Sequence, residues 1–300
     1  MSREQRARID ALLRQPPPAG PRSVEDIRAG FRALMAQMNV PSEIRTRTTT
    51  LGTRPAVLVE PAEASRPGTI LYFHGGGFVM GSPETAMSLT ANLVTRTGFR
   101  AISVDYRLAP EHPFPAAIQD TLAAYRALLD RGEDASAIAF AGDSAGGGLA
   151  VTTCLAARDA GLPLPAAIVA FSPGLDATHT GESMRTKVGI DPLFSHESLA
   201  YTGGMYLAGQ DPRQPLLSPA TLADLEGFPP ILLQAGTNEM LLDDSTRLAA
   251  RAQAAGVDVI LDITADVPHV FQSFTGTLDE ADQALDRAAL FLRQHLRGVG

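Results

Sequence analysis

The chain has 300 residues, of which 33 are acidic and 25 are Lys or Arg, so its net charge is −8 and its pI is near 5.3. This acidity argues against nucleic acid as the main partner. The mean hydropathy of +0.02 is typical of a soluble globular protein, and no apolar stretch reaches the roughly 18 residues of a membrane span. One cysteine, Cys154, excludes an internal disulfide and is expected to be a small buried residue. The charged N-terminus lacks the apolar segment of a signal peptide, which predicts a cytoplasmic protein.

Two amphipathic helices are predicted before the first strand. Residues 2–15 carry apolar side chains at helical spacing, and residues 24–38 follow a capping-box sequence formed by Ser23 and Asp26. In an α/β chain such helices must pack on the main body from outside. They are either plain packing elements or part of a lid.

Strands and helices alternate from residue 44 onward. Residues 44–50 and 54–60 alternate in polarity and predict an antiparallel edge, whereas residues 69–73 are continuously apolar, as in a buried parallel strand. Further strands are predicted at 101–104, 136–141, 166–171, 230–234 and 257–263. Helices are predicted at 87–97, 118–129, 148–160 and 279–296, and one more helix, after the strand 230–234, is predicted to end at residue 255. This order predicts an α/β fold with a mostly parallel central sheet and helices on both faces.

The sequence Gly142-Asp143-Ser144-Ala145-Gly146-Gly147 lies between a predicted strand and a predicted helix. A G-x-S-x-G sequence in that position predicts a nucleophile elbow, a sharp turn that strains the serine and lifts its hydroxyl out of the sheet. The glycines two residues to either side leave room for the strand and the helix to pass closely. The motif is weak alone, so the prediction depends on finding a base, an acid and an oxyanion hole.

The sequence His74-Gly75-Gly76-Gly77-Phe78 follows the buried strand 69–73. Glycines allow backbone N–H groups to face a cavity, and the position ahead of the elbow predicts an oxyanion loop of the HGGG type. We expect the amides of Gly75 and Gly76 to act there, joined by that of Ala145. A flexible turn is the alternative.

His269 is the best candidate for the base. It follows the last predicted strand, and loops at the carboxyl ends of parallel strands converge on one crevice. A neutral imidazole can take the proton of Ser144 and return it to a leaving group. His112 precedes the elbow in a proline-rich crossover, where Arg107 and Glu111 are expected to form hydrogen bonds. The other histidines are expected to be structural or at the surface: His74, His179, His196 and His295.

The base needs a carboxylate that fixes its tautomer. Glu239, Asp243 and Asp244 all follow the strand 230–234. Glu239 is nearest the end of that strand and is the preferred acid. Asp243 is the alternative, although it and Asp244 lie where a helix start favours acidic side chains for capping. The order Ser, acid, His is that of the α/β-hydrolases.

Residues 176–214, the inserted segment, break the strand–helix alternation. They predict short cap helices, which with residues 1–42 would cover a single domain whose catalytic core is 43–175 and 215–300. Met205 and Tyr206 suit the wall of an acyl pocket, and Phe78 of the glycine-rich loop is expected to join them. Core packing within the cap explains the large side chains of the inserted segment equally well.

Three motifs together resemble those of the bacterial hormone-sensitive-lipase-like esterases, family IV of the microbial lipases and esterases. They are HGGGF at 74–78, YRLAPEHPFPAA at 106–117 and GDSAGG at 142–147. The resemblance implies an α/β-hydrolase with a helical cap, which hydrolyses small-molecule esters of short to medium acyl chains without a cofactor or a metal. It also implies a homodimer formed through the edge of the last strand.

The resemblance carries over to individual residues. The nucleophile of the family falls on Ser144, its base on His269, and its oxyanion glycines on Gly75 and Gly76. Many members carry a D-P-L-x-D segment whose first Asp is the catalytic acid. Here the segment reads E-M-L-L-D, so that Glu239 stands at the acid position.

Two other functions stay open at the level of sequence. Plant gibberellin receptors are similar to this family and have lost the catalytic histidine, which makes them binding proteins. Because His269, Ser144 and Glu239 are all present here, an enzyme is favoured. A lactone hydrolase or an amide-cleaving deacetylase would keep the same machinery, and the fold does not fix the substrate.

Overall fold

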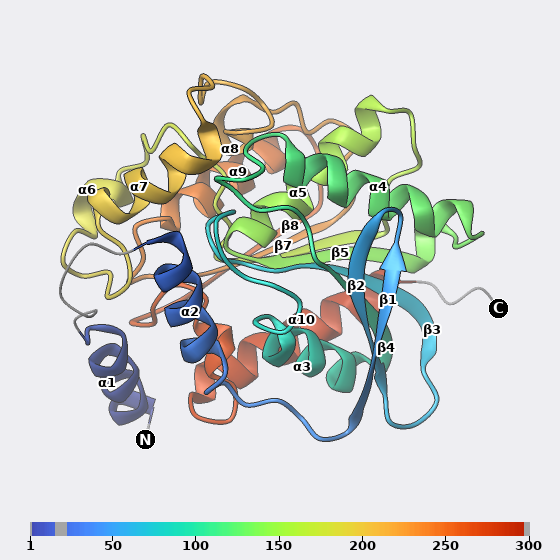
Figure 1. Ribbon diagram of the computed structural model, residues 1–300, viewed down its shortest axis with the longest axis horizontal. Helices are drawn as coiled ribbons and strands as arrows, with labels where there is room; N and C mark the ends of the chain where they lie inside the picture. Colours follow the sequence, from blue (N-terminus) through green and yellow to red (C-terminus); the bar gives the residue numbers. More distant parts are fainter. Residues whose placement is uncertain (1, 16–22, 297–300) are drawn as a thin grey trace.

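The computed structural model describes residues 2–15 and 23–296, and its centre is one eight-stranded sheet (Figure 1). The strands lie in the order β1-β2-β4-β3-β5-β6-β7-β8. Their bounds are β1 Ile44–Leu51, β2 Arg54–Pro61, β3 Arg66–Phe73, β4 Phe99–Val104, β5 Ile138–Asp143, β6 Ala167–Phe171, β7 Ile231–Gly236 and β8 Val259–Thr264. The pairs β1–β2 and β2–β4 are antiparallel, and all the others are parallel. The mostly parallel sheet with an antiparallel edge is confirmed.

Helices cover both faces of this sheet, as predicted. Those of the main body are α3 Met87–Thr97, α4 Ala116–Asp130, α5 Ala145–Asp159, α8 Pro219–Leu222, α9 Leu242–Ala254 and α10 Asp279–His295. Helices α4, α5 and α9 pack on one face, above the sheet in Figure 1, and α3 and α10 pack on the other. The chain therefore has the three-layer α/β architecture expected from its alternating elements.

Strand β3 shows how one strand serves both cores. Successive side chains of a strand point to opposite faces. Leu71 and Phe73 belong to the core with α4, α5 and α9, whereas Ile70 and Tyr72 belong to the core with α3 and α10. All four side chains are fully buried. Burial on both faces explains the continuous apolar run in the sequence.

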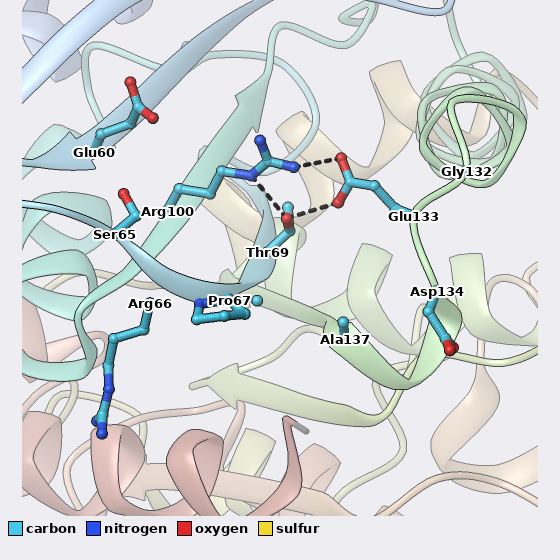
Figure 2. A pocket seen from close by; sticks show the side chains of 11 residues that line it. Glu60, Ser65, Arg66, Pro67, Thr69, Arg100, Gly132, Glu133, Asp134 and Ala137 are labelled. Carbon is cyan, nitrogen blue, oxygen red and sulfur yellow. Dashed lines mark hydrogen bonds and ion pairs between the residues drawn. The ribbon is translucent and has the colours of Figure 1, made fainter. Parts of the chain in front are cut away.

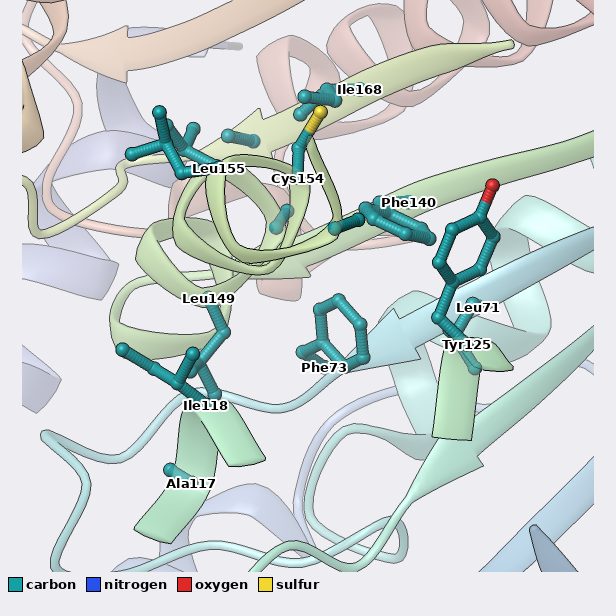
Figure 3. Packing of buried hydrophobic residues seen from close by; sticks show 14 of the residues in the cluster. Leu71, Phe73, Ala117, Ile118, Tyr125, Phe140, Leu149, Cys154, Leu155 and Ile168 are labelled. Carbon is teal, nitrogen blue, oxygen red and sulfur yellow. The ribbon is translucent and has the colours of Figure 1, made fainter. Parts of the chain in front are cut away.

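Aromatic rings join β3 and α4 to β5, and apolar side chains of α5 pack in the same core (Figure 3). The ring of Phe140 on β5 meets Phe73 and Tyr125 edge to face, with centroid distances of 5.7 and 4.7 Å. Cys154 of α5 is buried in the same core, as predicted, and burial raises the pKa of its thiol. This packing holds rigidly the strand that leads into Ser144.

The two N-terminal helices are α1 Ser2–Leu13 and α2 Val24–Met35. The predicted capping box of α2 is confirmed, since Ser23 accepts from the amide of Asp26 and the Asp26 carboxylate accepts from that of Ser23. Helix α1 packs on the loop that follows β8. Its Ile9 is buried with Val267 and Phe271, and its Arg6 forms an ion pair with Asp266 at 3.3 Å.

The inserted segment holds α6 Ser183–Thr186 and α7 His196–Leu207. These helices lie with α1 and α2 at one end of the molecule, on the left in Figure 1. Arg14 joins the two regions, because its guanidinium donates to the carbonyls of Gly189 at 3.2 Å and Ile190 at 2.7 Å. Residues 1 and 16–22 of the predicted cap, and 297–300 of the predicted core, lie outside the described residues.

The crossover after β4 is held by two arginines. Arg28 of α2 donates to the carbonyl of Val79 at 2.9 Å and pairs with Glu111 at 2.6 Å. This hydrogen-bonded pairing lowers the pKa of Glu111 to about 2. Arg107 pairs with Asp120 at 2.8 Å. The prediction that Arg107 and Glu111 anchor this loop by hydrogen bonds is confirmed.

Within residues 2–15 and 23–296, no helix combines the length and the apolar character needed to cross a bilayer. Over the same ranges, no group of three or more His, Cys, Asp or Glu side chains is arranged to hold a metal ion. The cytoplasmic location stays a prediction from the sequence.

Candidate active site

Ser144 lies in the turn between β5 and α5 with φ 53° and ψ −120°, a strained conformation for a residue other than glycine. A Cβ added to Gly146 would lie 1.9 Å from the carbonyl oxygen of Phe73, and one added to Gly142 would lie 2.3 Å from that of Gly146. Only glycine fits at these two positions, as the elbow motif predicts. Helix α5 begins at Ala145 rather than at the predicted residue 148, because tight packing on β3 overrides the low helix propensity of three consecutive glycines.

Ser144, His269 and Glu239 form one continuous chain of contacts. The Oγ of Ser144 lies 2.9 Å from Nε2 of His269, and Nδ1 of His269 lies 2.8 Å from Oε2 of Glu239. The His269 side chain is 5% exposed and that of Glu239 is fully buried. A carboxylate can only accept a hydrogen bond, so Nδ1 carries the imidazole proton and Nε2 is left to accept from the Ser144 hydroxyl.

The second carboxylate oxygen of Glu239 is also bound. Oε1 accepts from the Ser172 hydroxyl at 3.0 Å and, at shorter range, from the amide of Gly236. The same Ser172 hydroxyl accepts from the amide of Val270 at 3.0 Å. Ser172 thus connects the carboxylate to the residue that follows His269, and Glu239 is held by the loops after β6 and β8 and by the end of β7.

Asp243 and Asp244, the neighbours of Glu239, lie in the first turn of α9 and bind elsewhere. Asp243 accepts from the amide of Ser183 at 2.8 Å, and Asp244 accepts from those of Leu175 at 2.6 Å and Asp176 at 2.9 Å. Neither caps its own helix, contrary to the prediction. Instead they attach the inserted segment to α9. Of the three acidic candidates, the structure brings Glu239 against His269.

Gly75 is the first glycine of the predicted oxyanion loop. Its amide donates to Oδ1 of Asp143 at 3.1 Å, so its single hydrogen is already committed. Within the described part of the chain, the amides of Gly76, Gly77 and Ala145 have no acceptor. The amide of Gly75 therefore already has an acceptor, whereas those of Gly76, Gly77 and Ala145 are the donors left available; the oxyanion role of Gly75 stays a prediction.

The Asp143 carboxyl group fixes the start of the glycine-rich loop. Its Oδ1 accepts from the hydroxyl of Tyr72 at 2.8 Å as well as from the Gly75 amide. Burial raises its pKa to about 6, although these hydrogen bonds oppose the shift. His74 is fully buried and stacks on Tyr106 at 4.0 Å, and burial lowers its pKa to about 4. A neutral His74 whose Nδ1 donates to the Gly75 carbonyl at 2.8 Å fits the structural role expected of it.

The three residues predicted to bind substrate are in different environments. Phe78 and Tyr206 stack face to face with centroids 3.8 Å apart, and Tyr206 is only 6% exposed. Met205 is partly buried against the main core. Phe194 is another large side chain of the inserted segment, and its ring meets the His269 imidazole edge-on at 4.7 Å. Aromatic side chains thus lie close to both the loop and the base.

A separate surface hollow lies at the opposite end of the sheet (Figure 2). Thr69 at its wall pairs with Ile138, the first residue of β5, whereas Ser144 follows the last residue of that strand. Arg100 donates to Glu133 at 2.6 Å and to Thr69 at 2.9 Å across the hollow. Arg100 and Glu133 pair with each other, and the hollow is remote from Ser144.

Two positions in the site were missed at the level of sequence. Ser172 directly follows β6, and polar residues at the carboxyl ends of parallel strands are site candidates, so this rule could have found it. Gly77 could have been found only from the partner of the Gly75 amide, which depends on the register of two strands.

Known proteins share the fold and much of the sequence of this chain. The family described as alpha/beta hydrolase fold matches residues 70–273. An acetyl-hydrolase of Streptomyces hygroscopicus is 42% identical over 244 residues, which cover 81% of each chain. The crystal structure of an esterase from the bacterial hormone-sensitive lipase family has a TM-score of 0.94 at 41% identity and covers 98% of this chain and 99% of its own. The structure of EstE5 soaked with p-nitrophenyl butyrate has a TM-score of 0.92 at 37% identity and covers 97% and 98%. The chain therefore belongs to the α/β-hydrolase family and, within it, to the bacterial hormone-sensitive-lipase-like esterases, which are carboxylic ester hydrolases.

Proposed function

We propose that the chain hydrolyses short- to medium-chain acyl esters through an acyl-enzyme on Ser144. The observation that carries this proposal is the unbroken contact from Ser144 through His269 to Glu239. A serine hydroxyl is a weak nucleophile unless a base removes its proton during attack. A base 2.9 Å away, itself oriented by a buried carboxylate, meets that need.

In the acylation step, Oγ of Ser144 attacks the ester carbonyl carbon while Nε2 of His269 takes the hydroxyl proton. Glu239 stabilises the resulting imidazolium and remains ionised. The carbonyl oxygen becomes negative in the tetrahedral intermediate. We assign its stabilisation to the amides of Gly76, Gly77 and Ala145, and each such donor typically contributes about 3–4 kcal/mol.

Collapse of the intermediate breaks the bond to the leaving oxygen, which takes the proton from His269 and departs as the alcohol. Water then attacks the acyl-enzyme, with His269 again accepting a proton. The carboxylic acid leaves as the bond to Oγ breaks and His269 returns the proton to Ser144. The cycle uses only side chains and amides of this chain.

A preference for modest acyl chains is supported by the cap and by the relatives. We propose that residues 1–42 and 176–214 form a cap, and that Phe78, Met205 and Tyr206 shape the acyl side of the pocket. The stacked pair Phe78–Tyr206 joins the glycine-rich loop to α7 and would limit the depth of that pocket. One relative is named an acetyl-hydrolase, and another structure was soaked with a butyrate ester.

A homodimer through β8 is also proposed. Strand β8 is at the edge of the sheet, and its side chains Ile260, Leu261 and Ile263 are 51%, 36% and 41% exposed. An exposed apolar edge strand is a template for pairing with another chain. The molar mass measured in solution by light scattering tests this, and a monomeric mass at micromolar concentration rejects it.

The main experiment compares hydrolysis of p-nitrophenyl butyrate by the parent and by Ser144→Ala. The parent is expected to turn over, and the variant is expected to fall by about 10⁴-fold or more. If the parent is inactive on esters from acetate to decanoate, ester hydrolysis is the wrong class. Lactones, anilides and simple ligand binding would then be tested in its place.

A further inference from the structure

Asp191 lies in the inserted segment between α6 and α7 and is only 4% exposed. Its carboxylate accepts three backbone hydrogen bonds. Oδ1 accepts from the amides of Leu193 at 2.8 Å and Phe194 at 3.0 Å, and Oδ2 accepts from that of Met240 at 2.7 Å. A carboxylate removed from water is stable only when its oxygens are satisfied in this way.

The third of these bonds reaches the residue next to Glu239. Both polar backbone groups of Met240 are bound by the inserted segment, since its amide donates to Asp191 and its carbonyl accepts from the Ser183 hydroxyl at 2.7 Å. The Ser183 hydroxyl also accepts from the amide of Asp243 at 3.1 Å. The turn that carries Glu239 is therefore fixed from outside the main body of the fold.

The same short stretch also contacts the base. Phe194, whose amide is held by Asp191, meets the His269 ring edge-on at 4.7 Å. Phe194 packs with Met184, Leu199, Met240 and Leu241 in a small apolar cluster. A single buried carboxylate thus links the backbone at Glu239 with the aromatic ring that lies against His269.

We propose that Asp191 is a positioning residue that holds Glu239 in register with His269, so that the inserted segment completes the acid–base pair as well as covering it. This inference rests on the proposed function, in which Glu239 and His269 act as acid and base. Among the described residues Asp191 has no hydrogen bond to Ser144, His269 or Glu239, and it acts through the amide of Met240. The carboxylate is required, because an asparagine would turn an NH₂ group toward one of the amides now bound.

The test is a double-mutant cycle in the full chain. Asp191→Asn is expected to lower kcat on p-nitrophenyl butyrate by about ten- to hundredfold, the effect of losing a hydrogen bond to a charged group, with KM changed less than threefold. In the Glu239→Gln background the same substitution is expected to change kcat less than twofold, because the group that it positions is already lost. Rates are normalised to active sites titrated with a p-nitrophenyl phosphonate.

A spectroscopic readout separates this role from simple loss of folded protein. The Nδ1 proton of His269, bonded to Glu239, is expected to give a downfield ¹H NMR resonance that Ser144→Ala keeps. Asp191→Asn is expected to shift or broaden that resonance. Asp211→Asn is the matched control, since Asp211 accepts from the amide of Arg213 at 3.0 Å within the same segment but is exposed. It is expected to leave both kcat and the resonance unchanged.

If Asp191→Asn does not fold, Ser183→Ala is a second and milder variant, which also tests whether the inserted segment positions the turn that carries Glu239. It removes the bond to the Met240 carbonyl, and its smaller loss of kcat is also expected to vanish in the Glu239→Gln background. The proposal is overturned if the loss of kcat in Asp191→Asn or Ser183→Ala multiplies with the loss caused by Glu239→Gln, or if the substitutions change only KM. An inactive parent would reject the proposed function instead, and the resonance would still report on Asp191.

Discussion

The hydroxyl of Ser172 donates to Oε1 of Glu239 at 3.0 Å, on the carboxylate oxygen that faces away from His269. Ser172 itself has a positive φ of 44°, so the end of β6 is bent to bring its side chain there. Because it also accepts from the amide of Val270, one hydroxyl joins the loops of the proposed acid and base. The orientation of Glu239 therefore depends on a residue from a third loop.

Removing this hydroxyl is expected to impair catalysis more than stability. In Ser172→Ala, Glu239 loses one hydrogen bond to its charged group, worth about 1.5–3 kcal/mol, and the amide of Val270 loses its acceptor. We expect kcat on a butyrate ester to fall by about tenfold or more. Ser103→Ala is the control, since Ser103 is also a buried serine of the central sheet and has no hydrogen-bond partner for its hydroxyl among the described residues. Equal losses in the two variants would contradict the role of Ser172.

The assignment of Glu239 as the catalytic acid predicts which of two carboxylate variants loses more kcat. Glu239→Gln removes the charge that contacts His269, and we expect kcat to fall by about 10³–10⁴-fold. Asp243→Asn weakens bonds to the amide of Ser183 and the hydroxyl of Thr246, away from His269, and is expected to cost less than tenfold. Steady-state kinetics of the two purified variants at one pH decides between them. The reverse ranking would assign the acid to Asp243.

The buried carboxyl group of Asp143 predicts a pH dependence of stability. Its pKa is raised from 3.8 to about 6 by burial, so the folded state holds this proton more tightly than the unfolded chain does. Below pH 3.8 the group is protonated in both states and its burial does not lower the free energy of unfolding through ionisation. Above about pH 6 it must ionise in the folded state, and the full penalty of about 3 kcal/mol is present.

Asp143→Asn removes that ionisation while its Oδ1 still accepts from Tyr72 and Gly75. The free energy of unfolding of the variant is therefore expected to rise relative to that of the parent as the pH increases from 4 to 7. Urea unfolding at several pH values measures the difference. Parallel curves for the two proteins would show that Asp143 does not titrate in this range.

The fold could be predicted from the sequence because its signals are local. The buried run of residues 69–73 and the G-x-S-x-G spacing of residues 142–146 can each be recognised within a few residues. Ser144 and His269 carry chemistry that few other residue types supply, so their positions at strand ends were informative. The structure brings these two predicted residues into contact.

What the sequence could not predict depends on register and on contacts between distant segments. The amide of Gly75 is bound by Asp143 because Phe73 pairs with Gly142 across β3 and β5, and a shift of one residue would change that partner. Helix α5 begins three residues before the predicted start at residue 148, because the prediction follows helix propensity, which disfavours the glycines of its first turn. Asp191 gives no local signal, since its partner at Met240 is 49 positions away.

The packing of α1 has a consequence for the order of events during synthesis. Arg6 and Ile9 find their partners at Asp266, Val267 and Phe271, so α1 contacts residues that are made more than 250 positions after it. Chains grow at about 5–20 residues per second, which leaves α1 unpartnered on that surface for tens of seconds. Closing so long a loop is costly in entropy, and it precedes the gain from contact. Helix α1 therefore reaches its native place only after residues far along the chain have been made, and the loop that carries His269 gains this outer support at the same late stage.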